Sequence, residues 1–261
     1  MLNGTLAGAP TVSDLTPRRC VEVSTPTPEG ARLVLQTHPG SINEEERTRD
    51  VIVIGASAGG IQAVIELLSR LPADLPAAVG VVIHRWAGTD ADWSAILGRK
   101  TRIRVVEPAD GDAVTQGVVY VAPSDVHLTF AGGKIHLDRG AKVNYTRPAV
   151  DPLFTSAALE YGSRVVGVVL TGRGRDGLQG LLDIKAAGGL SLAQEPGEAE
   201  QASMPVHAIT GDHVDAVLSL DEIGDALVLL AGGSAVPVRR RIDRPVKTPA
   251  TGRPTGRRPL G

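Results

Sequence analysis

Apolar runs that alternate with segments of helical periodicity are the feature of this sequence that most constrains its fold. Residues 51–54 form one such run, and a glycine-rich turn then leads into apolar residues at helical spacing that end before Pro72. A second apolar run, 77–83, ends at His84 and precedes an amphipathic stretch that begins at Asp90. Strands that alternate with helices predict parallel pairing, because a parallel connection crosses a face of the sheet, usually through a helix.

The same alternation continues in the second half of the chain. Helical spacing at 151–161 precedes a β-branched run at 165–170, and a helical segment at 178–187 precedes a strand-like run at 190–194. We therefore predict an α/β fold with a doubly wound, mainly parallel sheet and helices on both faces.

Short runs in the middle of the chain differ from this pattern. Residues 118–121, 126–130 and 134–137 are rich in strand-forming side chains, and Gly132 and Gly133 separate the last two runs. A Gly-Gly pair between two such runs is typical of a hairpin. We expect these runs to form a small antiparallel edge with one hairpin.

The two ends of the chain have a different composition. Residues 1–48 show no periodicity, which predicts a flexible head, and the catalytic domain is expected at 49–233. From Arg239 onward seven arginines and one lysine stand against a single acidic residue, among several prolines. This composition predicts a disordered basic tail at 234–261, with a docking segment for an acidic partner as the alternative.

Overall composition argues against several classes of protein. A net charge of -2 offers no general attraction to nucleic acid. The sequence has no apolar stretch long enough to span a membrane and no secretory signal pattern, so we predict a cytoplasmic protein without membrane insertion. The single cysteine, Cys20, excludes a disulfide framework and a cysteine-based metal site. We expect neither a metal nor a cofactor.

The turn after the first strand carries the strongest chemical signal. Its residues from Gly55 to Gly59 match the Gly-x-Ser-x-Gly nucleophile elbow in the strand-to-helix context that this motif requires. Small neighbours let the backbone bend so that the Ser57 hydroxyl projects above the sheet, and the helix N-terminus offers N–H groups to an oxyanion. Phosphate binding and a plain tight turn are the alternatives, although the common phosphate-binding glycine patterns are absent.

Two further residues end strands at the same edge of the sheet. His84 follows the second strand, and Asp176 lies in the turn after the run at 165–170. A serine needs a base to take its proton, and a histidine base needs an acid behind it. We predict Ser57 as nucleophile, His84 as base and Asp176 as the group that orients the base. The alternatives are a packing or capping histidine and an aspartate that caps the next helix.

A second assignment of the base is open on these grounds. His207 and His213 follow Asp176 and satisfy the Ser, Asp, His order that is common in α/β-hydrolases. We rank them below His84 because the elbow follows the first strand and the two histidines flank a short polar stretch.

From Asp50 to about Leu230 the sequence resembles the protein-glutamate methylesterases of bacterial chemotaxis. Family-like segments occur in family order: Gly-Ala-Ser-Ala-Gly-Gly from Gly55, Val-Ala-Pro-Ser-Asp-Val-His-Leu from Val121, Arg-Pro-Ala-Val-Asp-Pro-Leu-Phe from Arg147, Leu-Thr-Gly-Arg-Gly-Arg-Asp-Gly from Leu170, Ala-Gln from Ala193 and Ser-Met-Pro from Ser203. The resemblance implies that Ser57, His84 and Asp176 match the family triad and decides against the other two histidines.

The resemblance also implies the reaction and the partner. The reaction is hydrolysis of glutamate methyl esters on chemoreceptor helices, with hydrolysis of certain receptor glutamines as a related activity. The partner is a methylated chemoreceptor cytoplasmic domain or a similar signalling protein. Family members commonly carry an N-terminal receiver domain, and a head of 48 residues is shorter than the roughly 100 residues of such a domain.

The alternative function is a non-catalytic regulatory or scaffold module that retains the fold. A nucleotide-binding domain is a third possibility for the function.

Five residues are further candidates for shaping the site. Ala58 and Arg173 stand where the family usually has threonine and methionine, and we expect both near the oxyanion. A cationic Arg173 side chain is expected to alter substrate preference. Arg147, Asp151 and Gln194 match family positions, with a loop anchor, a helix cap and a strand-end hydrogen bonder as their structural alternatives.

Overall fold

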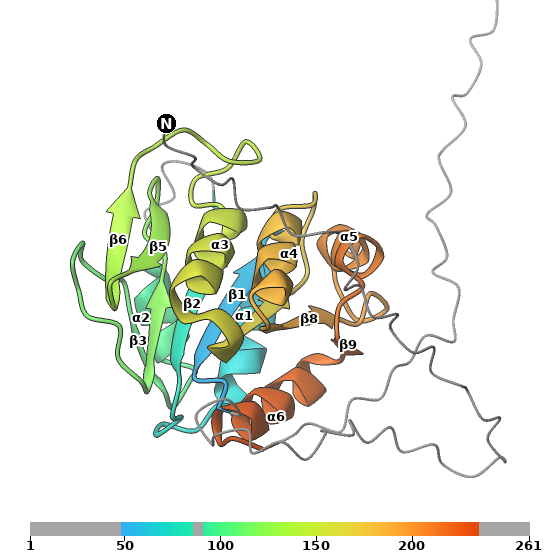
Figure 1. The fold of residues 1–261 in the computed structure, drawn as a ribbon, viewed down its shortest axis with the longest axis horizontal. Coiled ribbons are helices and arrows are strands. Elements are labelled where there is room, and N and C mark those ends of the chain that lie inside the picture. The colour runs from blue at the N-terminus through green and yellow to red at the C-terminus, as the bar shows by residue number, and fades with distance from the viewer. Residues whose placement is uncertain (1–47, 86–90, 235–261) are drawn as a thin grey trace, which may run out of the picture. The chain divides into compact units, whose positions relative to one another are not determined.

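The computed structural model describes residues 48–85 and 91–234 (Figure 1). The segments predicted to be a flexible head and a disordered basic tail lie outside these residues, apart from Thr48 and Ser234, and so does Cys20. None of the described helices is both long and apolar enough to span a bilayer.

A seven-stranded sheet forms the centre of the described fold, in the order β3-β4-β2-β1-β7-β8-β9. Its strands are β1 Val51–Ala56, β2 Ala78–Ile83, β3 Arg104–Val106, β4 Val118–Val121, β7 Val165–Val169, β8 Leu190–Gln194 and β9 Ala216–Leu218. All neighbouring strands pair in parallel. Every residue of β1, β2 and β7 is buried, which explains their continuous apolar runs.

Helices cover both faces of this sheet (Figure 1). The helices are α1 Gly60–Arg70, α2 Trp93–Gly98, α3 Val150–Tyr161, α4 Leu178–Ala186, α5 Ser203–Asp212 and α6 Leu220–Ala231, with a 3-10 turn, η2, at Gly162–Arg164. Buried residues of α1 and α6 share one core cluster, and those of α3, α4 and α5 share the other. The predicted doubly wound α/β fold is therefore confirmed.

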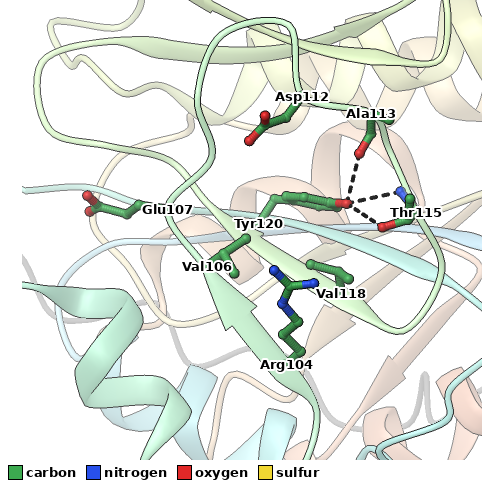
Figure 2. A pocket seen from close by; sticks show the side chains of 8 residues that line it. All are labelled: Arg104, Val106, Glu107, Asp112, Ala113, Thr115, Val118 and Tyr120. Carbon is green, nitrogen blue, oxygen red and sulfur yellow. Dashed lines mark hydrogen bonds between the residues drawn. The ribbon is translucent and has the colours of Figure 1, made fainter.

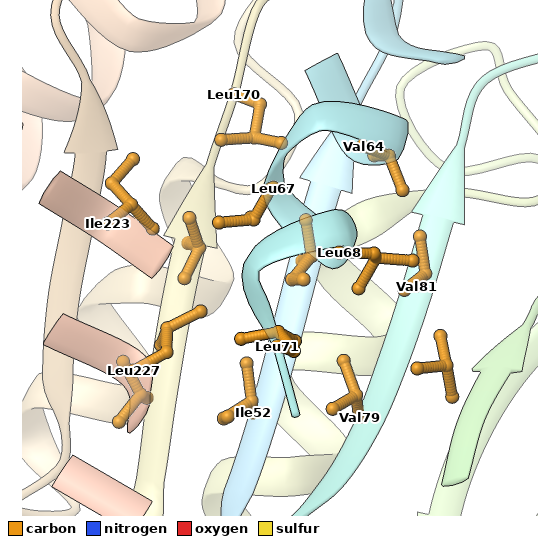
Figure 3. Packing of buried hydrophobic residues seen from close by; sticks show 14 of the residues in the cluster. Ile52, Val64, Leu67, Leu68, Leu71, Val79, Val81, Leu170, Ile223 and Leu227 are labelled. Atoms are coloured by element: carbon orange, nitrogen blue, oxygen red, sulfur yellow. The ribbon is translucent and has the colours of Figure 1, made fainter. Parts of the chain in front are cut away.

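Alternation along the strands divides the core between the two faces. Ile52 of β1 belongs to the cluster with α1 and α6, whereas its neighbour Val53 belongs to the cluster with α3 and α4. Figure 3 shows Leu67 and Leu68 of α1 above Ile52, with Ile223 of α6 beside them. Apolar side chains therefore cover both faces of the sheet. We look for the polar residues of a functional site at the strand ends.

The hairpin is not an edge of the main sheet. Strands β5 His127–Ala131 and β6 Lys134–Asp138 form a separate two-stranded antiparallel sheet, and Phe130 packs in the same cluster as α3. The prediction that 118–121 belongs to the antiparallel part is wrong, because β4 pairs in parallel with β2 and β3. All four β4 residues are buried, as expected of a strand covered on both faces.

The C-terminal elements extend the sheet beyond the predicted strands. The stretch around His207 is helix α5, and β9 and α6 follow it. A capping box starts α6: the Ser219 hydroxyl accepts from the Glu222 N–H at 3.2 Å, and the Glu222 carboxylate accepts from the Ser219 N–H at 3.0 Å. This helix completes the face that α1 begins.

The order of the strands indicates where a ligand is expected to bind. Strand β1 lies between β2 and β7, so the chain builds one side of the sheet first and then the other. Ligands of open parallel sheets bind outside the carboxyl ends of the strands at such a switch point. Ser57 follows β1, His84 follows β2, and Asp176 lies in the turn after β7.

Candidate active site

The turn that carries Ser57 is tied to the turn after β7. The Ser57 N–H donates to the Thr171 carbonyl at 3.0 Å, and the Gly60 N–H donates to the Ser57 carbonyl at 2.8 Å. Gly59 has a φ of 76°, a left-handed conformation that glycine adopts without strain. A Cβ on Gly172 would lie 2.7 Å from the Ser57 Cβ. The elbow therefore needs small residues, both in its own turn and in the neighbouring one.

His84 and Asp176 form a close pair beside this elbow. The His84 Nε2 lies 2.6 Å from the Asp176 Oδ2, and the two side chains are only 12% and 3% exposed. The Thr146 hydroxyl is 3.4 Å from the same nitrogen. The Nδ1 atom is therefore the ring nitrogen that remains for a reacting hydroxyl. Among the described residues no hydrogen bond joins Ser57 to His84, and catalytic hydrogen bonds often tighten only when substrate binds.

Asp176 sits at the N-terminus of α3. Its Oδ2 accepts from the Val150 N–H at 2.7 Å, and its Oδ1 accepts from the Asp151 N–H at 3.2 Å. Burial acts to raise the pKa of Asp176, but hydrogen bonds from His84 and the Val150 N–H outweigh it and hold the pKa below its usual value. The carboxylate is thus ionised at neutral pH, as a partner of a histidine base must be.

Asp176 was expected, as the alternative to a catalytic role, to cap the helix that follows it, and the structure shows that it caps a different helix. The N-cap of its own helix, α4, is Gly177 with a φ of 95°. Asp176 caps α3 instead, and Asp151 of α3 returns the contact by accepting from the Gly177 and Gly180 N–H groups, each at 2.9 Å. Burial and the nearby Asp176 charge raise the pKa of Asp151 to about 6, against the Gly180 and Asn144 hydrogen bonds.

Backbone donors suited to an oxyanion lie on both turns. Within the described part of the chain, the N–H groups of Ala58 and Arg173 donate to no other residue. The Thr171 hydroxyl donates to the Ala58 carbonyl at 3.0 Å and so joins the two turns. Buried Gln194 accepts from the Thr171 N–H at 2.8 Å. Gln194 therefore acts on the site through the turn, as in its structural alternative.

The side chains of Arg173 and Arg147 differ in how many hydrogen bonds hold them. Arg173 is exposed, and its Nε donates to Gln201 Oε1 at 3.2 Å. Arg147 binds Asp125 through Nε and Nη2, at 3.0 and 2.7 Å, and donates through Nη1 to two backbone carbonyls, those of Arg139 and Gly140. These contacts are those of the loop anchor that we gave as the alternative for Arg147.

The rival histidines are engaged elsewhere. His207 is exposed on α5, and its Nδ1 lies 2.7 Å from the Ser203 carbonyl of the same helix. His213 is an exposed residue at the C-cap of α5, with a φ of 53°. Asp176 pairs with His84 and with neither of them.

Two side chains near the His84–Asp176 pair were not among the predicted site residues. Asn144 donates to both Asp151 and Asp176, and Thr146 contacts His84. Both belong to one tight turn, in which Asn144 has a φ of 48°. Asparagine often occupies left-handed turn positions, so the sequence signals the turn but not its partner.

A hollow of about 350 Å³ lies apart from these residues (Figure 2). Its lining comes from β3, β4 and the segment between them, and the Tyr120 hydroxyl is held there by Thr115 and the Ala113 carbonyl. No member of the Ser57, His84 and Asp176 set lines it. We therefore place the candidate active site at the strand ends and not in this hollow.

Comparison with known proteins identifies relatives of this fold. Residues 52–227 match the family model described as CheB methylesterase. The CheB methylesterase catalytic domain of Thermotoga maritima is similar in structure, with a TM-score of 0.66 and 34% identity, covering 69% of this chain and 98% of that one.

Relatives identified by sequence carry a double activity in their names. A protein-glutamate methylesterase/protein-glutamine glutaminase of Anaeromyxobacter dehalogenans is 44% identical, over 68% of this chain and 52% of that protein. A Leptospira interrogans protein whose name gives the same two activities is 40% identical, over 69% of this chain and 94% of that protein. The chain thus spans nearly all of one relative and about half of the other.

The matches agree with one another and with the motifs in the turns. The family model covers more than half of the chain, from the second residue of β1 into α6. The solved relative has a similar fold over 69% of this chain. The predicted family and enzyme class are confirmed: the chain belongs to the CheB methylesterase family.

Proposed function

We propose that this protein hydrolyses methyl esters of glutamate side chains on a chemoreceptor-like protein, with Ser57 as nucleophile, His84 as base and Asp176 orienting the base. The observation that carries the proposal is the 2.6 Å His84–Asp176 pair at the sheet edge where the Ser57 turn also lies. The names of the relatives support the substrate class.

The reaction uses the Nδ1 of His84, because Asp176 is bound at Nε2. As the Ser57 Oγ attacks the ester carbonyl, its proton passes to the His84 Nδ1, and the carbonyl oxygen gains the negative charge. We assign the binding of that oxyanion to the Ala58 and Arg173 N–H groups, for which no acceptor is found among the described residues. The intermediate collapses, the bond to the methoxy group breaks, and methanol leaves with the proton from His84. The product of this step is a glutamyl ester on Ser57.

Water completes the cycle by the same route. A water molecule gives a proton to His84 as its oxygen attacks the acyl carbon, and the Ser57 oxygen then leaves with that proton. The carboxylate product is the receptor glutamate. Asp176 stays ionised throughout, fixes the tautomer with Nδ1 unprotonated and stabilises the imidazolium.

A second activity shares this machinery. A glutamine side chain gives the same acyl intermediate when ammonia replaces methanol as the leaving group. The glutaminase part of the relatives' names favours it. The Arg173 side chain is exposed, and we expect its positive charge to favour substrates with acidic side chains near the scissile group.

The wider organisation is part of the same proposal. We place the catalytic domain at 49–233 and the protein in the cytoplasm, where the receptor segment is accessible. The partner is a methylated receptor cytoplasmic domain. Docking of an acidic partner by the basic tail stays a prediction, because that segment is outside the described residues.

The test measures methanol release from a methylated receptor cytoplasmic domain. We expect turnover by the wild type and none by Ser57→Ala, His84→Ala or Asp176→Asn. Ser69→Ala and His136→Ala are matched controls, because both residues are exposed and lie outside the site, on α1 and β6. These controls should retain full turnover.

Three results would change the proposal. A wild type that hydrolyses a small activated ester through Ser57 but not the receptor ester keeps the mechanism and removes the substrate. A wild type that binds the receptor domain and hydrolyses neither ester supports the scaffold alternative. A nucleotide-dependent shift in thermal melting would favour the nucleotide-binding alternative.

A further inference from the structure

We propose that Asn144 is a positioning residue of this active site, whose side-chain amide bridges Asp176 and Asp151 and keeps the Asp176 carboxylate directed at His84. The proposal rests on the proposed function, because it assigns Asp176 to the base. Among the hydrogen bonds of the described residues, none joins the Asn144 side chain to Ser57 or His84.

A strained turn presents Asn144 to the two carboxylates. Residues Val143 and Thr146 exchange backbone hydrogen bonds of 3.2 and 2.9 Å, and the residues between them, Asn144 and Tyr145, have φ values of 48° and 65°. Two positive φ values in a two-residue turn define type I′, which favours asparagine and glycine. Strained turns persist where surrounding contacts hold them, often at functional sites.

The amide of Asn144 uses both of its donor sites. Its Nδ2 lies 2.8 Å from the Asp151 Oδ2 and 2.9 Å from the Asp176 Oδ1. A primary amide carries two N–H groups, so one serves each carboxylate. The other Asp176 oxygen faces His84. Rotation of the carboxylate away from His84 therefore breaks the Asn144 bond as well.

Charge gives the bridge a second effect. Asp151 and Asp176 are neighbouring acids: burial and the charge of Asp176 raise the pKa of Asp151, while the hydrogen bond from Asn144 acts to lower it. The groups that face this pair are His84 after β2, Asn144 from the turn, and the N–H groups that begin α3 and α4. Without Asn144 the pair binds a proton at higher pH, and a shared proton weakens the charge that Asp176 presents to His84.

Two substitutions separate this role from a role in the turn. Asn144→Gly removes the amide and Asn144→Asp replaces its donors with an acceptor, yet both residues tolerate the left-handed backbone. For Asn144→Gly we expect kcat to fall about tenfold with KM unchanged, as for one lost hydrogen bond. For Asn144→Asp, which adds a third carboxylate, we expect a loss of about 100-fold. Tyr145→Gly is the matched control and should keep the wild-type kcat.

The pH dependence provides the readout that a purely structural role does not move. The pH below which kcat/KM falls should be higher in Asn144→Gly than in the wild type. The carboxyl carbon resonances of Asp151 and Asp176 should titrate at higher pH as well, and this NMR measurement does not depend on turnover. It keeps the test independent of the substrate assignment.

The outcomes are distinct. If Asn144→Gly and Asn144→Asp both keep the wild-type kcat and the wild-type carboxyl titration, the residue only shapes the turn and the proposal is overturned. If the titration moves but the wild type hydrolyses no ester, the bridge stands and the proposed function fails. Equal losses in Tyr145→Gly would assign the effect to the turn and also overturn the proposal.

Discussion

A methyl group added at Gly172 is expected to displace the nucleophile. The ideal Cβ of an alanine there would lie 2.7 Å from the Ser57 Cβ and would overlap the Met204 side chain. Met204 has a flexible chain and can turn aside. Ser57 has less freedom, because its backbone is bonded to Thr171 and Gly60.

The size of the effect follows from the missing space. Non-bonded carbon atoms rest at about 3.5–4.0 Å, so the two Cβ atoms must separate by roughly 1 Å. A displacement of that size at a reacting group costs about 100-fold in rate. The added methyl group also overpacks the region around Ser57 and Met204, which lowers the free energy of unfolding by about 1–3 kcal/mol.

Two glycine variants separate these effects. Gly167→Ala is also overpacked, with its Cβ 2.7 Å from the Ile184 Cδ1, but it lies in β7 away from the elbow. Gly98→Ala has its nearest neighbour, the Val105 Cβ, at 3.9 Å and should lower neither property. We expect Gly172→Ala alone to lose kcat in the methanol assay, at a temperature where circular dichroism shows all three variants folded. Wild-type kcat in folded Gly172→Ala, or an equal loss in Gly167→Ala, would refute the reasoning.

Three further predictions concern stability, each measured by denaturant unfolding. The pKa of Asp151, about 6 in the fold against roughly 3.9 unfolded, means that its contribution is present below about pH 4 and lost as pH rises to about 6. Wild type should lose stability over that window relative to Asp151→Asn, and a constant difference would contradict this. Tyr145→Gly should gain on the order of 1 kcal/mol, because Tyr145 is 96% exposed at positive φ; a loss would show hidden packing. Asp50→Ala should lose about 1–3 kcal/mol with unchanged kcat, because Arg164 binds Asp50 at 2.7 and 2.6 Å; an unchanged stability would argue against it.

The sequence predicted the strands that are buried on both faces. Continuous apolar runs identify β1, β2, β7 and β8, and their ends place Ser57, His84 and the Asp176 turn at one edge. Strand β3 escaped prediction because it has three residues and begins with an exposed arginine, Arg104. The parallel pairing of β4 was missed because a short buried apolar run has the same sequence pattern in parallel and antiparallel sheets.

The parts of the site that escaped prediction are contacts between distant turns. Gln194 was predicted either to shape the site or to form a strand-end hydrogen bond, but the sequence did not indicate that its partner is the Thr171 N–H. Asn144 carried a turn signal, but its two carboxylate partners come from α3 and from the turn before α4. A pattern along the chain reports on strands and helices, whereas these bonds depend on how two helices lie side by side.

The packing of α3 against α4 and the chemistry of the site are one arrangement. Asp151 of α3 holds the first N–H groups of α4, and Asp176, just before α4, holds the first N–H groups of α3. Each helix N-terminus stabilises the other's carboxylate through its N–H groups and its dipole. Because one of these carboxylates also binds His84, a change that separates the two helices must turn Asp176 away from the base. Helix packing and base orientation are therefore expected to fail together when the α3–α4 contact is loosened.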